Sequence, residues 1–288
     1  MPFYPADNVR SQVRPPAVAG RFYPADPDEL GRLVEWCRAH PIGPGGSPDA
    51  GIASTTSIAI APHAGLVYSG PVAAHAHLAL AGSRRVVIVG PSHFGSGSAV
   101  ALSSAAAWRT PLGDIPVDTA LTATIASRCP FASVDDHAHR DEHSIEVQLP
   151  FIAAWFAPGT TIVPIALGGV LPAHLVSLGL ELGGLVSAGD VSLLATTDLS
   201  HYLRDDIARS IDDRTIADIV SGDPDRLVRS YRESVAQLCG LGPVVVAMVA
   251  ARHAGLVRPR LLARCTSADT GGPPSSVVGY AAIAFYPD

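Results

Sequence analysis

Short, continuously apolar β runs that alternate with helical segments are the feature that most constrains the fold of this chain. Such runs are typical of strands in a parallel sheet that is covered on both faces, because neither face of the strand meets water. The alternation therefore predicts an α/β fold, with a mostly parallel central sheet between two layers of helices. The runs are Ser57–Ile60, Arg85–Val89, Thr161–Leu167 and Val191–Thr196.

Helical patterns occupy the segments between and after these runs. Asp26 is placed to cap a first helix, and Pro150 is expected to kink a later one. Two more β runs, Leu261–Thr266 and Ser276–Phe285, close the chain. The expected helices are Pro27–Ala39, Pro71–Leu80, Ser144–Trp155, Leu171–Leu185, Ile207–Val220 and Leu241–His253.

Composition favours one folded domain. The 288 residues are 48% hydrophobic and 16% charged, which excludes an intrinsically disordered chain. One-domain α/β folds of this size are common, and no segment has the composition of a linker between domains. We therefore expect a single domain over residues 1–288.

Charge and hydropathy exclude several classes of partner. The formal net charge is -6 and no basic patch stands out, so nucleic acid is not an expected partner. The longest apolar run, Val244–Ala251, is too short to cross a membrane, and Met1–Arg14 lacks the apolar core of a signal peptide. We expect a cytoplasmic protein with reduced thiols and no CxxC site. The sequence does not indicate an oligomeric state.

Three of the predicted strands each end in a loop that carries a histidine. His63 lies in APHAGLVYSG, His93 in GPSHFG and His201 in TTDLSHY. Ligands of open α/β sheets bind beyond the carboxyl ends of the strands, so these loops are expected to converge. Proline and glycine beside the first two histidines allow sharp turns that aim a side chain. The alternative is that each histidine only bonds to nearby backbone.

Asp198 and Cys239 are the next candidates for chemistry. Asp198 precedes His201 by three residues, and a carboxylate beside an imidazole suits a general base. The alternative is that Asp198 or Ser200 only caps the next helix. Cys239 comes just before a predicted helix, whose dipole is expected to lower the pKa of the thiol and favour a ligand or nucleophile. Otherwise Cys239 is a small buried apolar residue.

The segment DDHAHRDEHSIE, residues 135–146, is the most polar stretch of the chain. We interpret its first part as a solvated loop. His143 and Glu146 begin an apolar-periodic helix, and we expect them to point into the pocket. In the alternative interpretation, the acidic residues and histidines of the whole segment bind one metal ion together. Its other members are His137, His139, Asp141 and Glu142.

Six ordered blocks of the chain resemble the Memo-like family: RPPAVAGRFYPADPDEL, APHAGLVYSGPVAA, VVIVGPSHFG, DEHSIEVQLPF, TTDLSHY and CGLGPV. The resemblance extends over nearly the whole chain. The family in turn resembles the class III extradiol dioxygenases of the protocatechuate 4,5-dioxygenase type, which hold non-haem Fe(II) with two histidines and one carboxylate. The resemblance therefore implies a class III extradiol dioxygenase-like fold in three layers.

The resemblance also implies roles for individual residues. His63 and His93 match the metal histidines, and His201 matches the acid/base histidine. Cys239 stands where the dioxygenases place a glutamate ligand, and Asp198 matches a pocket aspartate of the Memo-like proteins. Because a thiolate is a softer ligand than a carboxylate, the change favours copper, zinc or another iron state and argues against ring cleavage.

The sequence as a whole predicts a metal-binding protein with a redox role and an unassigned reaction. The expected metal is iron or copper, with zinc as an alternative. A small molecule or a peptide is expected in the pocket, and the resemblance implies a radical SAM protein as a partner. The alternatives are a peptide-binding module with a vestigial active site and a non-haem iron dioxygenase that acts on an aromatic substrate.

Overall fold

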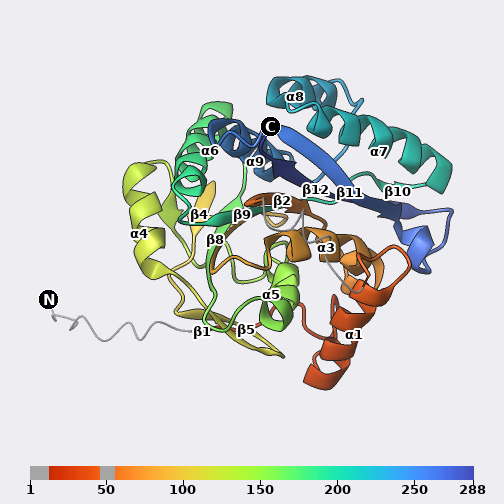
Figure 1. The fold of residues 1–288 in the computed structure, drawn as a ribbon, viewed down its shortest axis with the longest axis horizontal. Coiled ribbons are helices and arrows are strands. Elements are labelled where there is room, and N and C mark those ends of the chain that lie inside the picture. Colours follow the sequence, from red (N-terminus) through yellow and green to blue (C-terminus); the bar gives the residue numbers. More distant parts are fainter. Residues whose placement is uncertain (1–12, 46–55) are drawn as a thin grey trace, which may run out of the picture.

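The computed structural model describes residues 13–45 and 56–288. At its centre lie four parallel strands in the order β2 (Ile58–Ala61), β9 (Ser192–Thr196), β3 (Arg85–Pro91) and β8 (Thr161–Leu167). Their side chains are almost all buried on both faces, as continuous apolar runs require. This arrangement confirms the predicted α/β fold with a parallel centre (Figure 1).

Antiparallel strands extend this sheet on both sides. β12 pairs with β2 and also carries β10 and β11, while β4 pairs with β8 and carries β7. A separate three-stranded sheet lies below the main one. The added strands of the main sheet are β4 Val100–Leu102, β7 Ser133–Val134, β10 His201–Leu203, β11 Arg258–Thr266 and β12 Val277–Tyr286. The small sheet consists of β1 Val13–Arg14, β5 Ala107–Thr110 and β6 Gly113–Pro116.

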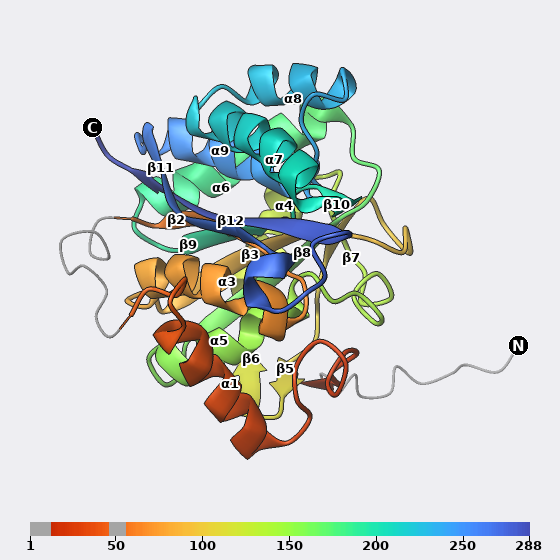
Figure 2. The same ribbon diagram turned by 90° about the vertical axis from the view of Figure 1, so that its right-hand side faces the viewer.

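Helices cover both faces of the main sheet, which gives three layers (Figure 2). On one face lie α1 (Pro27–Ala39), α3 (Leu66–Leu80) and α5 (Leu149–Trp155). The opposite face carries the remaining α-helices, and each face has its own apolar core. The helices of that second face are α4 Thr119–Arg128, α6 Pro172–Ser187, α7 Asp205–Val220, α8 Pro224–Arg232 and α9 Leu241–His253.

Most predicted helices appear with small shifts at their ends. Two local predictions were wrong: the start of α3 and the kink at Pro150. The predicted N-cap Asp26 accepts a hydrogen bond from Glu29 N. α3 begins at Leu66 and runs through Pro71, one turn earlier than predicted. The predicted kink at Pro150 is absent, because a short 3-10 helix (Glu146–Gln148) precedes α5 and places Pro150 in its first turn. A proline there loses no helical hydrogen bond.

The order of the parallel strands determines where the histidine loops lie. β2 and β3 flank β9, and all three run in the same direction. The loops that follow them therefore leave the sheet at one edge, which confirms that the predicted strand-end loops converge. No helix among the described residues is long and apolar enough to cross a membrane.

Candidate metal centre

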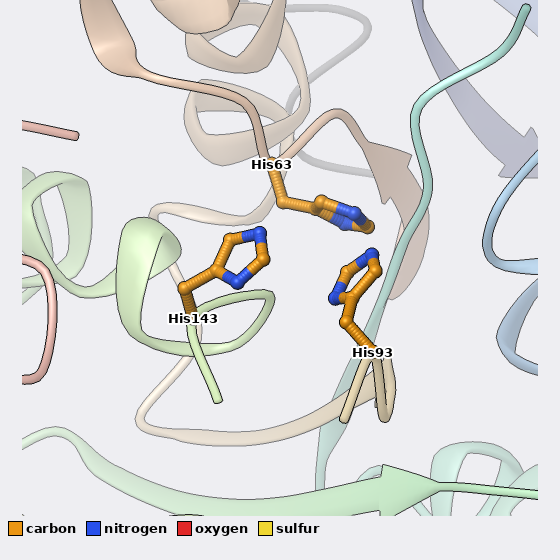
Figure 3. Close-up of side chains that lie close together, drawn as sticks. All are labelled: His63, His93 and His143. Atoms are coloured by element: carbon orange, nitrogen blue, oxygen red, sulfur yellow. The ribbon is translucent and has the colours of Figure 1, made fainter. Parts of the chain in front are cut away.

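Three histidines from distant parts of the chain meet beyond the carboxyl ends of the strands. His63 follows β2, His93 follows β3, and His143 lies in the turn before the 3-10 helix. One ring nitrogen of each can be chosen so that all three lie within 4.8 Å of one another. Figure 3 shows the three rings gathered from separate segments. The rings of His93 and His143 are stacked, with centroids 4.6 Å apart.

The buried His63 is held from two sides by the end of β9. Its backbone N donates to Asp198 Oδ1 at 2.8 Å, and its ring Nδ1 lies 3.0 Å from Thr196 Oγ1. Burial, followed by the nearby charges of His93 and His143, keeps the pKa of His63 well below its usual value. The imidazole is therefore neutral at pH 7, and a neutral imidazole has a free lone pair for a metal ion.

One buried carboxylate, that of Glu142, connects the other two histidines. It accepts hydrogen bonds from His93 N at 2.6 Å and from His93 Nδ1 at 2.9 Å. It also accepts from the backbone N of His143 and of Ser144. Burial alone would raise the pKa of Glu142, but these bonds outweigh it and lower the pKa to about 2. The ionised carboxylate therefore keeps the proton of His93 on Nδ1 and leaves Nε2 free.

His143 lies between this cluster and the N-terminal segment. Its ring packs against Phe22, with centroids 4.5 Å apart. Burial lowers the pKa of His143 to about 4, so this imidazole is also neutral at pH 7. His143 and Glu146 were predicted together as pocket residues at the start of a helix, and the structure places only His143 in the three-histidine cluster.

The structure places Glu146 beside the N-terminal segment. Its carboxylate pairs with Arg14, whose guanidinium also lies over the ring of Trp108. It accepts further hydrogen bonds from Tyr23 Oη and from the backbone N of Ala17 and Val18. These bonds use both carboxylate oxygens, and they fix the segment that precedes α1 against the turn that carries His143.

Cys239 touches His63 but lies outside the 4.8 Å group that the described residues form. Its Sγ is 3.2 Å from His63 Nε2 and accepts a hydrogen bond from Asp198 N. Burial, with the negative charge of Asp198, raises the pKa of Cys239 to about 12. The prediction that the helix dipole lowers this pKa was wrong, because desolvation and the nearby carboxylate outweigh the end of α9.

Asp198 and His201 lie close to the cluster without capping a helix. Burial raises the pKa of Asp198 to about 6, although its Oδ1 accepts from His63 N. His201 Nδ1 bonds to Leu199 O at 2.9 Å, which leaves Nε2 for other contacts. The N-cap of α7 is Arg204, so the alternative of a capping role for Asp198 was wrong. Their catalytic roles stay a prediction.

The polar segment 135–146 is less solvated than its sequence suggested. His137 and Asp141 are exposed, but His139 and Glu142 are buried. His139 packs against Trp108 and bonds to Ala101 O. Of the six residues that the alternative interpretation would gather around one metal ion, only His143 belongs to the group of ligand atoms.

Two further residues hold the site in shape. Glu142 was assigned only in the alternative metal-binding interpretation, and Gln148 was not assigned at all. Gln148 Nε2 donates to Pro62 O at 3.0 Å, next to His63, while its Oε1 accepts from His77 Nε2 at 2.8 Å. The sequence signal for both was their place in the block that carries His143, where polar residues alternate with apolar ones that are buried.

The set of donors restricts which metal ions fit. Imidazole nitrogen suits zinc, copper, iron and nickel, whereas magnesium and calcium prefer oxygen. The cluster presents three imidazoles, with a thiol next to one of them. Both carboxylate oxygens of Glu142 accept hydrogen bonds from His93, and Asp198 Oδ1 accepts one from His63 N. The residues therefore fit a transition-metal ion.

Comparison with known proteins agrees with the sequence and the fold. The family model for Memo-like protein matches residues 14–284. A MEMO1 family protein of Methanopyrus kandleri is 39% identical over 282 residues, which cover 94% of this chain and 98% of that one. A MEMO1 family protein of Ignicoccus hospitalis is 41% identical over 280 residues, with 95% and 98% covered.

A solved structure shares the fold alone. It is an uncharacterized protein of Escherichia coli K12, with 12% sequence identity and a TM-score of 0.55. The match covers 78% of this chain and 99% of the other. This likeness agrees with the three-layer α/β architecture and says nothing of the reaction.

Proposed function

The chain belongs to the Memo-like family, and from that premise we propose that it is a cytosolic protein that binds iron or copper for redox chemistry. The observation that carries the proposal is the three-histidine cluster, in which imidazoles from three segments place ligand atoms within 4.8 Å, and in which lowered pKa values keep His63 and His143 neutral. Its position beyond the ends of parallel strands is where α/β folds bind ligands.

The thiol of Cys239 is a second feature that fits a soft transition-metal ion. At 3.2 Å from His63 Nε2, it adds a soft donor beside the imidazoles. Soft sulfur ligands suit Cu(I), thiolate-bound iron and zinc, so zinc remains the alternative to iron or copper. A bound iron or copper ion would supply one-electron redox chemistry at this edge of the sheet. His63, His93 and His143 would hold it, with Cys239 as the further donor.

The surrounding residues would orient these ligands and handle protons. Thr196 and Glu142 occupy the Nδ1 atoms of His63 and His93, so each would bind the metal through Nε2, which in His63 is the atom that Cys239 Sγ contacts. Asp198 holds the backbone of the His63 loop. His201, bonded through Nδ1 to a carbonyl oxygen, would exchange a proton through Nε2. The reaction that these parts perform is unassigned.

Metal analysis of untagged protein purified without oxygen tests the proposal. We expect about one iron or copper ion per chain after reconstitution. His143→Ala should weaken binding more than about 100-fold, because a lost ligand costs more than a lost outer partner. Cys239→Ser should weaken it too, because a soft sulfur donor is replaced by a hydroxyl.

Two control variants keep this experiment specific. His137→Ala removes an exposed histidine of the same polar segment, and Cys129→Ser removes a buried thiol of the opposite helical layer. Both should bind metal like the original chain. The proposal is wrong if the reconstituted, folded protein takes up neither iron nor copper.

A further inference from the structure

A hollow of about 510 Å³ opens beside the three-histidine cluster, and nothing in the metal proposal uses it. His143 is part of its wall, so the hollow and the cluster share one side chain. The other walls come from the segment before α1, from Phe94 and from Arg140 with Asp141. Its volume is in the range of pockets that bind small molecules.

The walls of this hollow are largely apolar and partly aromatic. Pro16, Val18 and Phe22 form one side, and Phe94 contributes a ring that is 61% exposed. Phe94 follows the ligand candidate His93 directly in the sequence. A flat apolar group that covers this large exposed ring would bind favourably, because apolar surface of both partners is removed from water.

The charges around the hollow leave one cation without a partner. Arg140 Nε pairs with Asp141 at 3.1 Å, so these two residues balance each other. Arg21 forms no ion pair with any of the residues that the structure describes. It lies at the tip of the turn that joins Ala19 to Tyr23, and its charge is near enough to act on His143. The hollow therefore complements a single negative charge.

The apolar wall is fixed before any ligand arrives. The backbone N of Ala17 and of Val18 donate to the buried carboxylate of Glu146, which also pairs with Arg14. On the far side of the turn, Phe22 O accepts from Leu66 N at the start of α3. A wall held in this way loses little freedom on binding, which favours affinity for small ligands.

We propose that this hollow binds a small organic monoanion with a flat apolar body, a ring carboxylate, as the substrate of the neighbouring metal centre. The carboxylate binds Arg21, and the ring lies against Phe22 and Phe94. The role as substrate rests on the proposed metal site, since His143 belongs to both. Binding itself does not require the metal, so the two proposals can fail separately.

Binding of 4-fluorobenzoate to the full chain tests this, followed by the ¹⁹F line width and by calorimetry. We expect saturable binding to chelator-treated protein with a Kd of about 1 mM, as suits a ligand of this size. The uncharged 4-fluorobenzamide has the same shape and should bind at least about 10-fold more weakly, because its contact with Arg21 lacks a full charge.

Three variants locate the site. Arg21→Gln should weaken binding of the carboxylate about 10- to 100-fold and leave the amide unchanged. Phe94→Ala should weaken both ligands. Arg32→Gln removes another exposed arginine, on α1 and outside the hollow, and should change neither.

Each possible result of these binding experiments either supports or overturns the proposal. If the carboxylate does not bind, or binds as well to Arg21→Gln as to the original chain, the proposal is overturned while metal uptake is unaffected. If an acetylated pentapeptide that ends in phenylalanine binds about 10-fold more tightly than the ring acid, the hollow is a peptide site and the proposal is also overturned. Carboxylate binding without any metal uptake would support the hollow and refute the metal centre.

Discussion

Glu142 is the residue on which the geometry of the candidate metal centre most depends. It accepts four hydrogen bonds from His93, His143 and Ser144, and its side chain is 1% exposed. We expect Glu142→Gln to weaken metal binding about 10- to 100-fold, the usual effect of losing an outer partner of a ligand histidine. The amide cannot accept at both former oxygen positions, so one His93 contact is lost. A competition titration with a chromophoric chelator measures the change.

The matched control for this prediction is Glu29→Gln, the same change at an exposed position of α1. It should leave metal affinity unaltered. Urea unfolding of the metal-free variants separates a shift of the ligands from a general loss of stability. Equal affinities for Glu142→Gln and the original chain would show that the carboxylate does not orient His93.

Individual residues also show where the sequence was informative about the site and where it was not. His63 and His93 stand at strand ends in proline-glycine turns, a local pattern that predicted their convergence. Glu142 lies in a stretch of charged residues, and its burial depends on contacts with a loop 49 positions away in sequence. The pKa of Cys239 likewise depends on Asp198, which approaches it only in the folded chain.

At the scale of elements, the sequence predicted long apolar strands and amphipathic helices better than short ones. β8 and α1 have their predicted bounds, because a continuous apolar run identifies the strand and a helical period with an N-cap identifies the helix. β7 has two residues and β4 has three, too few for a period to be visible. α8 begins with proline after its cap Asp223, a start signal that we did not interpret as a helix.

Gly240 is where two of these elements approach too closely for any side chain. It precedes α9, and a Cβ there would overlap the carbonyl oxygen of Thr196 and the side chain of Thr197 at the end of β9. We expect Gly240→Ala to lower the free energy of unfolding by about 2 kcal/mol, as overpacked sites do, because backbone rather than a flexible side chain must move. Urea unfolding measures it.

A second glycine gives the opposite expectation for the same substitution. Gly31 lies inside α1, and a Cβ there would meet no atom within 4 Å. Gly31→Ala should raise the free energy of unfolding by about 0.5–1 kcal/mol, because alanine loses less backbone entropy in a helix. If Gly240→Ala and Gly31→Ala had the same free energy of unfolding, the contact of Gly240 with Thr196 and Thr197 would not be tight.

At the scale of the whole molecule, buried neutral histidines make stability depend on pH. Burial lowers the pKa of His77 to about 4, although Gln148 bonds to its ring, and burial with the charge of Arg14 lowers that of His139 to about 4. Unfolded histidine has a pKa of about 6.5. Between these values the unfolded chain binds protons that the folded protein does not, so stability is full above pH 6.5 and falls as the pH drops toward 4.

This linkage gives a quantitative expectation for His77. At pH 5, one such histidine should cost about 2 kcal/mol of stability relative to pH 7. His77→Gln keeps a donor for Gln148 Oε1 but cannot titrate. Between pH 7 and pH 5, its free energy of unfolding should therefore fall by about 2 kcal/mol less than that of the original chain. The exposed His137→Gln should follow the original chain. Urea unfolding with a chelator present keeps metal release from contributing. An unchanged pH dependence in His77→Gln would mean that His77 is protonated in the folded protein, and the stacked contact with Phe151 would then enclose a charge.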